Sequence, residues 1–301
     1  MKKTFLLFVM ITATLSSFAK IWRINNNAGI TADFSTVFAA ATSPTVLAGD
    51  TIHLEPSSIT YQTNSIILTK RLVFIGPGFF LDPASASTPG NAGLQATTED
   101  SEISFMRLGP GSDGTRFLGV SIVGSLYMNG SSNVSFEKVY FPTGVYYESG
   151  TNDGHTYRKC FFNNSANIGT SGTAVITNFI CENNIFYNNS YVTLPTLSGS
   201  GNIFRNNSIS GGNGMTLSNI YIANNIFGTS ASIFVNCTIK NNLFQANQTL
   251  PGTATNNQLN VNIANVYVGG TTGSFDSRMA LKAGSPAIAA GLTIGAIVTP
   301  D

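Results

Sequence analysis

A four-residue phrase recurs in the second half of this 301-residue chain: two asparagines followed by two residues that are mostly apolar. It occurs as Asn183-Asn184-Ile185-Phe186, Asn206-Asn207-Ser208-Ile209, Asn224-Asn225-Ile226-Phe227 and Asn241-Asn242-Leu243-Phe244, with a weaker Asn256-Asn257-Gln258-Leu259 downstream. Variants extend it upstream as Leu118-Gly119-Val120-Ser121, Glu137-Lys138-Val139-Tyr140 and Arg158-Lys159-Cys160-Phe161. The third positions, 120, 139, 160, 185, 208, 226 and 243, lie 19, 21, 25, 23, 18 and 17 residues apart.

A period near twenty that tolerates insertions predicts a solenoid, because each unit contacts only its neighbours and the turns absorb extra residues. Leucine-rich repeats share this period, but they would show regularly placed leucines and helical segments. Here the repeated positions are Ile, Phe, Val and Tyr, with Gly and Asn between them, which favours strands joined by tight turns. The fold class predicted is all-β.

Stacked coils would place the same turn position of successive rungs about 4.8 Å apart. The alignment predicts one column of Lys138, Lys159, Asn184, Asn207, Asn225 and Asn242, beside a column of Glu137, Arg158, Asn183, Asn206, Asn224 and Asn241. An amide both donates and accepts, so an inward column can form a hydrogen-bonded ladder. We therefore predict a structural, inward-pointing ladder of Asn184, Asn207, Asn225 and Asn242.

Both ends of the repeat region carry motifs that resemble the pectin lyase-like, right-handed parallel β-helix superfamily. Residues 33–41, DFSTVFAAA, resemble its short capping helix with Asp33 as N-cap, and residues 49–56, GDTIHLEP, resemble its opening strand. Residues 72–78, LVFIGPG, match the following coil, and residues 281–291, LKAGSPAIAAG, resemble a terminal segment of secreted bacterial members. The resemblance implies one β-helix domain over residues 20–301. It says little about activity, since the superfamily includes lyases, hydrolases, esterases, adhesins and modules without chemistry.

The first 19 residues have the pattern of a secretory signal peptide. Met1-Lys2-Lys3 is basic, residues 4–15 are almost all apolar, and Ser17-Phe18-Ala19 supplies small residues for cleavage near Ala19. We expect a secreted or cell-surface protein without a membrane span, because no stretch reaches about 20 apolar residues. Removing Lys2 and Lys3 leaves 13 basic against 14 acidic residues, which argues against nucleic acid as a partner. We expect a monomer.

Few residues suggest a metal, cofactor or redox site. Cys160, Cys181 and Cys237 are isolated, and we expect buried free thiols. Residues 99–102, with Glu99, Asp100 and Glu102, are interpreted as a solvated loop. The run at residues 211–214, GGNG, resembles a calcium-binding repeat, but Thr216 occupies the position that needs Asp. The sequence predicts neither metal nor cofactor.

One charged constellation falls in consecutive predicted coils: Glu137, Lys138, His155, Arg158, Lys159, Glu182 and Arg205. In the alignment Glu137 stacks on Arg158, and Glu182 stacks on Arg205. One interpretation is a set of exposed cross-coil ion pairs, each worth at most about 1 kcal/mol. The other is a glycan groove in which His155 or Lys159 acts as base, with Glu182 as a further catalytic candidate and Arg158 or Arg205 neutralising a substrate carboxylate.

Tyrosines offer possible sugar-stacking faces, although several must pack between coils. The candidates are Tyr140, Tyr146, Tyr147, Tyr157, Tyr187, Tyr191 and Tyr221, of which Tyr157 lies in the charged constellation. The sequence favours a non-catalytic extracellular β-helix that binds a glycan or another surface component, or serves as a rigid module. The alternative is a polysaccharide lyase or glycoside hydrolase that acts on an acidic polysaccharide through the charged constellation.

Overall fold

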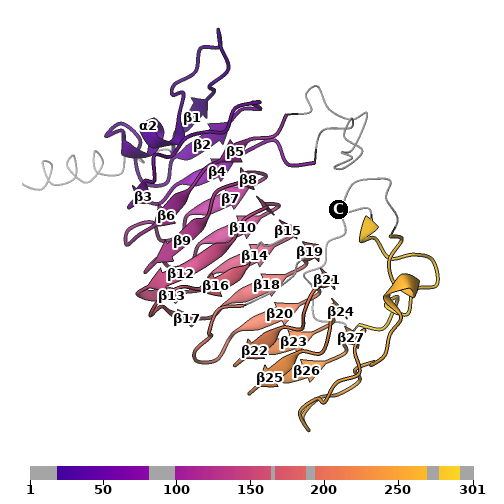
Figure 1. Cartoon of the computed structure of the whole chain (residues 1–301). Helices are drawn as coiled ribbons and strands as arrows, with labels where there is room; N and C mark the ends of the chain where they lie inside the picture. The colour runs from indigo at the N-terminus through magenta and orange to yellow at the C-terminus, as the bar shows by residue number, and fades with distance from the viewer. Residues whose placement is uncertain (1–18, 81–98, 164–166, 188–193, 270–277, 292–301) are drawn as a thin grey trace, which may run out of the picture.

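The computed structural model describes residues 19–80, 99–163, 167–187, 194–269 and 278–291. These residues coil into a parallel β-solenoid of about eight turns, in which each rung pairs with the rung before and after it. Figure 1 shows the strands stacked in sequence order from the N-terminal end to the C-terminal end. The predicted all-β solenoid is therefore confirmed. The predicted signal peptide lies outside the described residues, except for Ala19.

Three parallel sheets form the long walls of the solenoid. Sheet A has ten strands: β1 (Ile21–Ile24), β2 (Thr51–Leu54), β4 (Val73–Ile75), β7 (Arg116–Leu118), β10 (Ser135–Glu137), β14 (Thr156–Arg158), β18 (Ile180–Glu182), β20 (Ile203–Arg205), β23 (Tyr221–Ala223) and β26 (Thr238–Lys240). Sheet B has eight: β5 (Glu102–Ile103), β8 (Ser121–Ile122), β11 (Tyr140–Phe141), β15 (Phe161–Asn163), β19 (Ile185–Tyr187), β21 (Ser208–Ser210), β24 (Ile226–Gly228) and β27 (Leu243–Phe244). Sheet C has five: β3 (Ile67–Leu68), β6 (Met106–Leu108), β9 (Leu126–Asn129), β12 (Val145–Ser149) and β16 (Ile168–Thr170).

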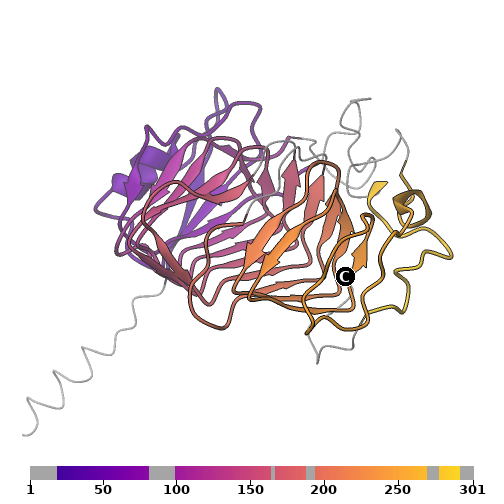
Figure 2. The same cartoon turned by 60° about the horizontal axis from the view of Figure 1, so that its bottom comes forward.

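Two short sheets complete the rungs. One pairs β13 (Thr151–Asp153) with β17 (Val175–Thr177), and the other pairs β22 (Thr216–Ser218) with β25 (Ile233–Val235). Figure 2, turned by 60° from the first view, shows the strands and turns of successive rungs running around a common interior. Strand side chains alternate between this interior and the surface, as a period of two requires.

The corner between sheets A and B turns at a residue in the left-handed backbone region. Lys138, Lys159, Asn183, Asn206, Asn224 and Asn241 have φ between 50° and 56° there, and Gly119 has φ 63°. The column alignment predicted for the upstream coils was wrong by one residue. Lys138 and Lys159 stack with Asn183, and Glu137 and Arg158 stack with Glu182. The residues in the ladder position upstream are therefore Val139 and Cys160, which have no amide.

The ladder itself is present and points inward. Asn184, Asn207, Asn225 and Asn242 are at most 1% exposed. In each rung the side-chain Nδ2 and the backbone N donate to the Oδ1 of the next rung, at 2.8–3.0 Å, and Asn257 ends the series. Nδ2 also donates to a backbone carbonyl of the preceding rung, for example Asn225 to the Phe204 oxygen at 2.9 Å. Every polar atom of the buried amides has a partner, which is the condition for burying them without loss.

Stacked aromatic rings fill the interior of the first half. Phe74, Phe117, Phe136 and Tyr157 follow one another along sheet A with ring centroids 4.8–5.1 Å apart. A second stack along sheet B joins Phe141, Phe162 and Phe186 at 4.6–4.9 Å. Both spacings equal the distance between strands, so the register of the rungs brings the rings face to face.

A short helix, α2 (Val37–Thr42), lies at the N-terminal end beside β1 and β2 (Figure 1). Its N-cap is Thr36, whose hydroxyl accepts from the Ala39 N at 3.0 Å, and not the predicted Asp33. The Asp33 carboxylate instead accepts from the Arg23 N at 2.8 Å. The helix thus begins three residues later than predicted, because residues 33–35 hold the chain against β1.

Candidate functional site

A row of charged side chains crosses the outer face of sheet A. The last residues of four consecutive strands, Glu137, Arg158, Glu182 and Arg205, are partners in the parallel register. The pairings of Glu137 with Arg158 and of Glu182 with Arg205 follow the sequence alignment. Three of these side chains also converge: Arg158 Nε and Arg205 Nε donate to the two oxygens of Glu182, the second at 2.6 Å.

Glu182 is the centre of this row and only 1% exposed. Burial disfavours its ionised form, but hydrogen bonds from Arg158 and Arg205 outweigh that effect and hold the pKa of Glu182 below its ordinary value. A carboxylate held by two guanidinium groups, with a lowered pKa, is a poor acceptor for a proton from a substrate. The structure thus favours the cross-coil ion-pair interpretation for Glu182.

His155 lies inside the solenoid and not on this row. It precedes β14 at the corner where Val134 and Phe179 occupy the equivalent buried positions of the adjacent rungs. Its Nε2 lies 2.7 Å from the Ser131 carbonyl oxygen, and burial lowers the pKa of His155 to about 4. The hypothesis that His155 is a base in a surface groove is therefore wrong, since no substrate on the outer face can reach it.

Tyr157 is also buried, so its interpretation as a sugar-binding residue is wrong. Its side chain is 0% exposed, and its hydroxyl lies 3.0 Å from that of Tyr147, which is equally buried. Tyr140, Tyr187 and Tyr221 are half-buried on outer faces of the sheets, while Tyr191 lies outside the described residues. A role of Glu137, Lys138, Arg158 and Arg205 in glycan binding, and of Lys159 as a base, stays a prediction.

The outer face of sheet C carries a row of half-buried aromatic side chains that sequence reasoning largely missed. The ring centroid of Tyr127 lies 5.1 Å from that of Phe105 and 5.5 Å from that of Tyr146, in neighbouring rungs. The Arg107 guanidinium carbon lies 4.8 Å from the Tyr127 ring centroid and 5.3 Å from that of Phe105. Glu148 holds this guanidinium through a contact of 3.2 Å to Nη2.

Only Tyr146 of this group was a candidate from the sequence. The missing signal was the register: Arg107, Tyr127 and Tyr146 are partners on adjacent strands, in the outward position. Gly144 lets the Tyr146 ring lie against the backbone, because a Cβ on Gly144 would come within 2.6 Å of the ring. The result is an aromatic row with a fixed cation, two features that suit the apolar faces and polar edges of sugars.

The acidic residues 99–102 are not a simple solvated loop, contrary to the prediction. Glu102 begins β5, and its carboxylate accepts from the Thr60 hydroxyl at 2.6 Å. Asp100 is half-buried and accepts from the Ser121 hydroxyl at 2.6 Å. Burial raises the pKa of Asp100, the Ser121 bond lowers it, and the charge of Glu102 raises it further, with a net increase. Two carboxylates, of which Asp100 has a raised pKa, thus lie at one end of sheet B.

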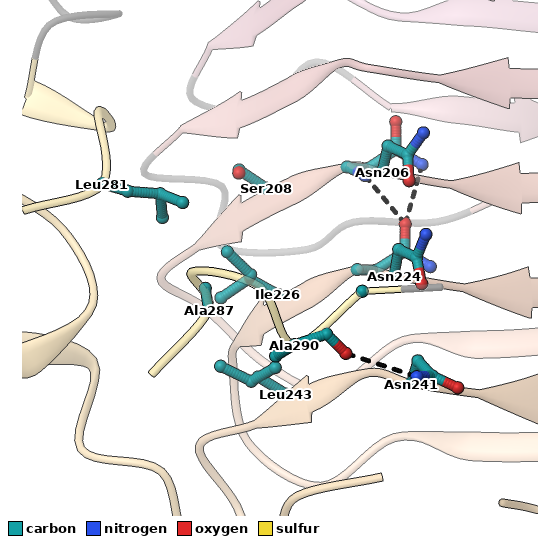
Figure 3. Close-up of a pocket in the computed structure, with 12 residues that line it drawn as sticks. Asn206, Ser208, Asn224, Ile226, Asn241, Leu243, Leu281, Ala287 and Ala290 are labelled. Carbon is teal, nitrogen blue, oxygen red and sulfur yellow. Dashed lines mark hydrogen bonds between the residues drawn. The ribbon is translucent and has the colours of Figure 1, made fainter. Parts of the chain in front are cut away.

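The C-terminal described segment, residues 281–291, packs on the flank of the solenoid. Figure 3 shows Ala287 and Ala290 beside Ile226 and Leu243, and the Ala290 oxygen accepts from Asn241 Nδ2 at 3.3 Å. A cavity of about 260 Å³ remains between this segment and the column of turn asparagines. The segment therefore packs against rungs that are already formed and does not add a further rung to the solenoid.

Among the described residues, no group of three or more His, Cys, Asp or Glu side chains is placed to hold a metal ion. Cys160, Cys181 and Cys237 are buried free thiols, as predicted. None of the helices in the described part of the chain has the length and apolar character needed to cross a bilayer.

The fold defines the class of this protein as a parallel β-solenoid. The chain has no significant match to a protein-family model, to a curated protein or to a solved structure.

Proposed function

We propose that this protein is a secreted, monomeric β-helix of the pectin lyase-like kind that binds a glycan without chemically altering it. The observation that carries the proposal is the aromatic row of sheet C, Phe105, Tyr127 and Tyr146, with Arg107 fixed over it. Rings at successive rungs offer apolar surface along the solenoid axis, and sugars in a chain can pack against it while their hydroxyls bond to Arg107 and Glu148.

The ion pairing and burial of the side chains in and behind the charged row support a non-catalytic role for sheet A. Glu182 is neutralised by two guanidinium groups, and His155 and Tyr157 are buried. Proton transfer to a substrate needs a group within hydrogen-bonding reach of it, and these three side chains do not offer one at the outer face. The rigid stack of rungs suits a module that presents a surface.

A glycan array with the full chain tests this proposal. Tyr127→Ala and Tyr146→Ala should each weaken binding of any glycan that scores by about tenfold, since each removes a stacking face. Tyr221→Ala, on the outer face of sheet A, is the matched control and should leave binding unchanged. Equal binding by all three variants, or no glycan bound by the parent chain, would refute the proposal.

A carbohydrate-active enzyme is the second candidate, and the raised pKa of Asp100 beside Glu102 favours it. A carboxyl whose pKa is raised, beside a second carboxylate, is the kind of pair from which general acid catalysis of glycoside cleavage can be built. Acidic polysaccharides should be incubated with the chain and assayed for reducing ends and for the absorbance of unsaturated uronates. Turnover lost in Asp100→Asn would favour this candidate, whereas turnover lost in Lys159→Ala would restore the charged row as the site.

A further inference from the structure

The backbone of Lys20 is held at the start of the first rung, directly after Ala19, near which the sequence predicts cleavage. Lys20 N donates to Asp50 Oδ1 at 2.9 Å, and the Lys20 oxygen accepts from Thr51 N at 2.8 Å. Both bonds continue the parallel register of β1 and β2, in which Ile21 pairs with Thr51. Ala19 and Lys20 are exposed, so the peptide bond between them lies at the surface of the solenoid.

Asp50 is a buried carboxylate that accepts from neutral N–H groups. It is 4% exposed, and its Oδ2 accepts from Trp22 Nε1 and from Leu47 N, both at 2.8 Å. Burial disfavours the ionised form, but the hydrogen bonds from Trp22, Lys20 and Leu47 hold the pKa of Asp50 below its ordinary value. At neutral pH Asp50 is therefore a negative charge inside the end of the solenoid.

The basic side chains near Asp50 do not neutralise this charge by direct contact. Lys20 Nζ lies 3.3 Å from the centroid of the Trp22 ring, and its charge has the smallest of the effects on the pKa of Asp50. Lys70 Nζ donates to two backbone carbonyls of the preceding loop, and the Arg71 guanidinium lies beside the turn that leads into β2. None of the ion pairs within the described part of the chain includes Asp50. Buried charges in proteins are usually paired, so this carboxylate calls for a cation.

Hydrolysis of the peptide bond after Ala19 would create that cation in place. Water supplies an oxygen to the Ala19 carbonyl carbon, the C–N bond breaks, and the products at neutral pH are a carboxylate on Ala19 and an ammonium group on Lys20. The nitrogen of this ammonium group is the one that already lies 2.9 Å from Asp50 Oδ1. A neutral hydrogen bond thereby becomes a charge-assisted one, which is shorter and roughly twice as strong.

We propose that a signal peptidase cleaves the chain after Ala19 and that the new α-ammonium group of Lys20 forms an ion pair with Asp50. The inference rests on the secretion in the proposed function and is independent of glycan binding on sheet C. β1 is the end strand of sheet A and pairs with β2 alone. An additional bond at this end stabilises a rung that has a neighbour on one side only, so the first rung is complete only in the processed chain.

The cleavage position is measured on the full chain, exported from a bacterial host with its own first 19 residues. Mass spectrometry of the exported protein should give Lys20 as the first residue. Cleavage at any other bond overturns the proposal. A chain that is neither exported nor cut refutes the secretion on which the proposal rests, and the proposal with it, whereas a loss of glycan binding alone affects neither.

Two chains that differ by one residue test the ion pair. One begins at Lys20, and the other begins at Ala19, which moves the ammonium group one residue further from Asp50 and keeps Lys20 N as an amide donor. At about pH 7 the chain that begins at Lys20 should melt about 2–4 °C higher. An α-ammonium group loses its proton near pH 8 in an unfolded chain and at higher pH in an ion pair. The difference should therefore be complete below about pH 7 and disappear towards about pH 10.

Trp22 gives a second measurement, because it is the only tryptophan of the chain and its Nε1 donates to Asp50. Its fluorescence should change as the ammonium group loses its proton in the chain that begins at Lys20. In the chain that begins at Ala19 it should stay level over the same pH range. Equal fluorescence profiles in the two chains would overturn the proposal without the need for any substitution.

Asp50→Asn should remove the difference in melting temperature between the two chains. Because it also takes acceptors from Trp22 and Leu47, it should lower both melting temperatures, and the difference between the chains is the quantity compared. Asp33→Asn is the matched control, since the Asp33 carboxylate accepts from a backbone N–H in the same end rung, and it should preserve the difference. Equal melting temperatures of the two parent chains at about pH 7, or a difference that persists in Asp50→Asn, would overturn the ion pair.

Discussion

The corner between sheets A and B is built in two ways in the two halves of the solenoid. In the first half its inward positions hold Val120, Val139 and Cys160, and in the second half they hold the asparagines of the ladder. The turn before them is left-handed in both halves. The same backbone geometry is therefore compatible with an apolar corner and with a fully hydrogen-bonded polar one.

Cys160 shows how the two halves meet. Its backbone N donates to Asn184 Oδ1 at 2.8 Å, and its thiol lies 3.5 Å from the Phe136 oxygen and 3.3 Å from the Arg158 oxygen. Asn242 Nδ2 donates to the corresponding carbonyls, those of Ile222 and Lys240. The thiol thus occupies the place of the amide as a weak donor. At the Cys160 rung the amide is thus replaced by a weaker donor, whereas Val120 and Val139 provide no side-chain donor.

Breaking the ladder should have the largest effect. Asn225→Leu removes the acceptor of two Asn207 donors and the donor to the Phe204 oxygen and Asn242 Oδ1. We expect the free energy of unfolding to fall by about 3–5 kcal/mol, because several buried groups lose their partners at once. Urea denaturation measures this. Asn224→Gly, in the adjacent left-handed turn, should cost less than about 1 kcal/mol, and a similar cost for both variants would contradict the ladder's role.

Acid should weaken the first half through His155. Its pKa is about 4 in the folded protein and about 6.5 in the unfolded chain, so the unfolded state binds more protons between these values. Stability should be complete above pH 6.5 and fall by about 3 kcal/mol as the pH drops towards 4. The measurement is urea unfolding at a series of pH values. His155→Phe should flatten the profile in this window, and an unchanged slope would exclude His155 as its source.

The ion pairs of sheet A connect the two halves, since Arg158 belongs to the rung of Cys160 and Glu182 to the rung of Asn184, the first asparagine of the ladder. Glu182→Gln should lower the free energy of unfolding by about 1–2 kcal/mol, less than for a fully buried pair because Arg158 is 42% exposed. The contribution of Glu182 should disappear as the pH falls below its unfolded pKa and through its lower folded one. Glu137→Gln is the control. A loss of stability in it equal to that in Glu182→Gln would show that the effect is not specific to the buried carboxylate.

Extending the ladder upstream should have the smallest effect. Cys160→Asn would place an amide where Asn184 Oδ1 and two carbonyls are already within reach. We expect a change within about 1 kcal/mol, because the stronger hydrogen bonds are offset by the larger side chain in a packed interior. Thermal unfolding measures it, with Val139→Asn as comparison. Val139→Asn should destabilise clearly more, since it would introduce an amide beside Cys160 and without a ladder acceptor.

The sequence supported the solenoid and the ladder because both follow from local patterns. The period of about twenty residues, the alternation of apolar residues and the Asn pairs are visible without knowledge of the fold. The upstream alignment failed by one residue because Lys138 and Lys159 take the left-handed position, in which Asn and Gly are the usual residues. Nothing in the local sequence marks a lysine for that backbone conformation.

The candidate site shows where sequence reasoning ends. That Glu182 would meet an arginine of a neighbouring coil followed from the spacing, but the convergence of two arginines on it did not. His155 and Tyr157 are buried because of their positions in the rung. His155 lies at a corner and Tyr157 is the middle residue of β14, and both positions turn the side chain inward. Judged by residue type alone, these polar side chains would be expected on the surface. The aromatic row of sheet C required the register of three strands separated by turns of unequal length.

The sequence by itself determined the repeat, the strand character and the amide ladder, since each is a relation between residues at a fixed spacing. The tertiary structure decided which polar side chains are buried, which rings share a face and where the chain after β27 packs against sheet B. These outcomes depend on the exact lengths of the turns and on contacts between residues that are far apart in sequence. Asn184 and Asn257 thus end up in one hydrogen-bonded series, while Glu137 and Arg158, two positions before the ladder column, lie on the outer face of sheet A.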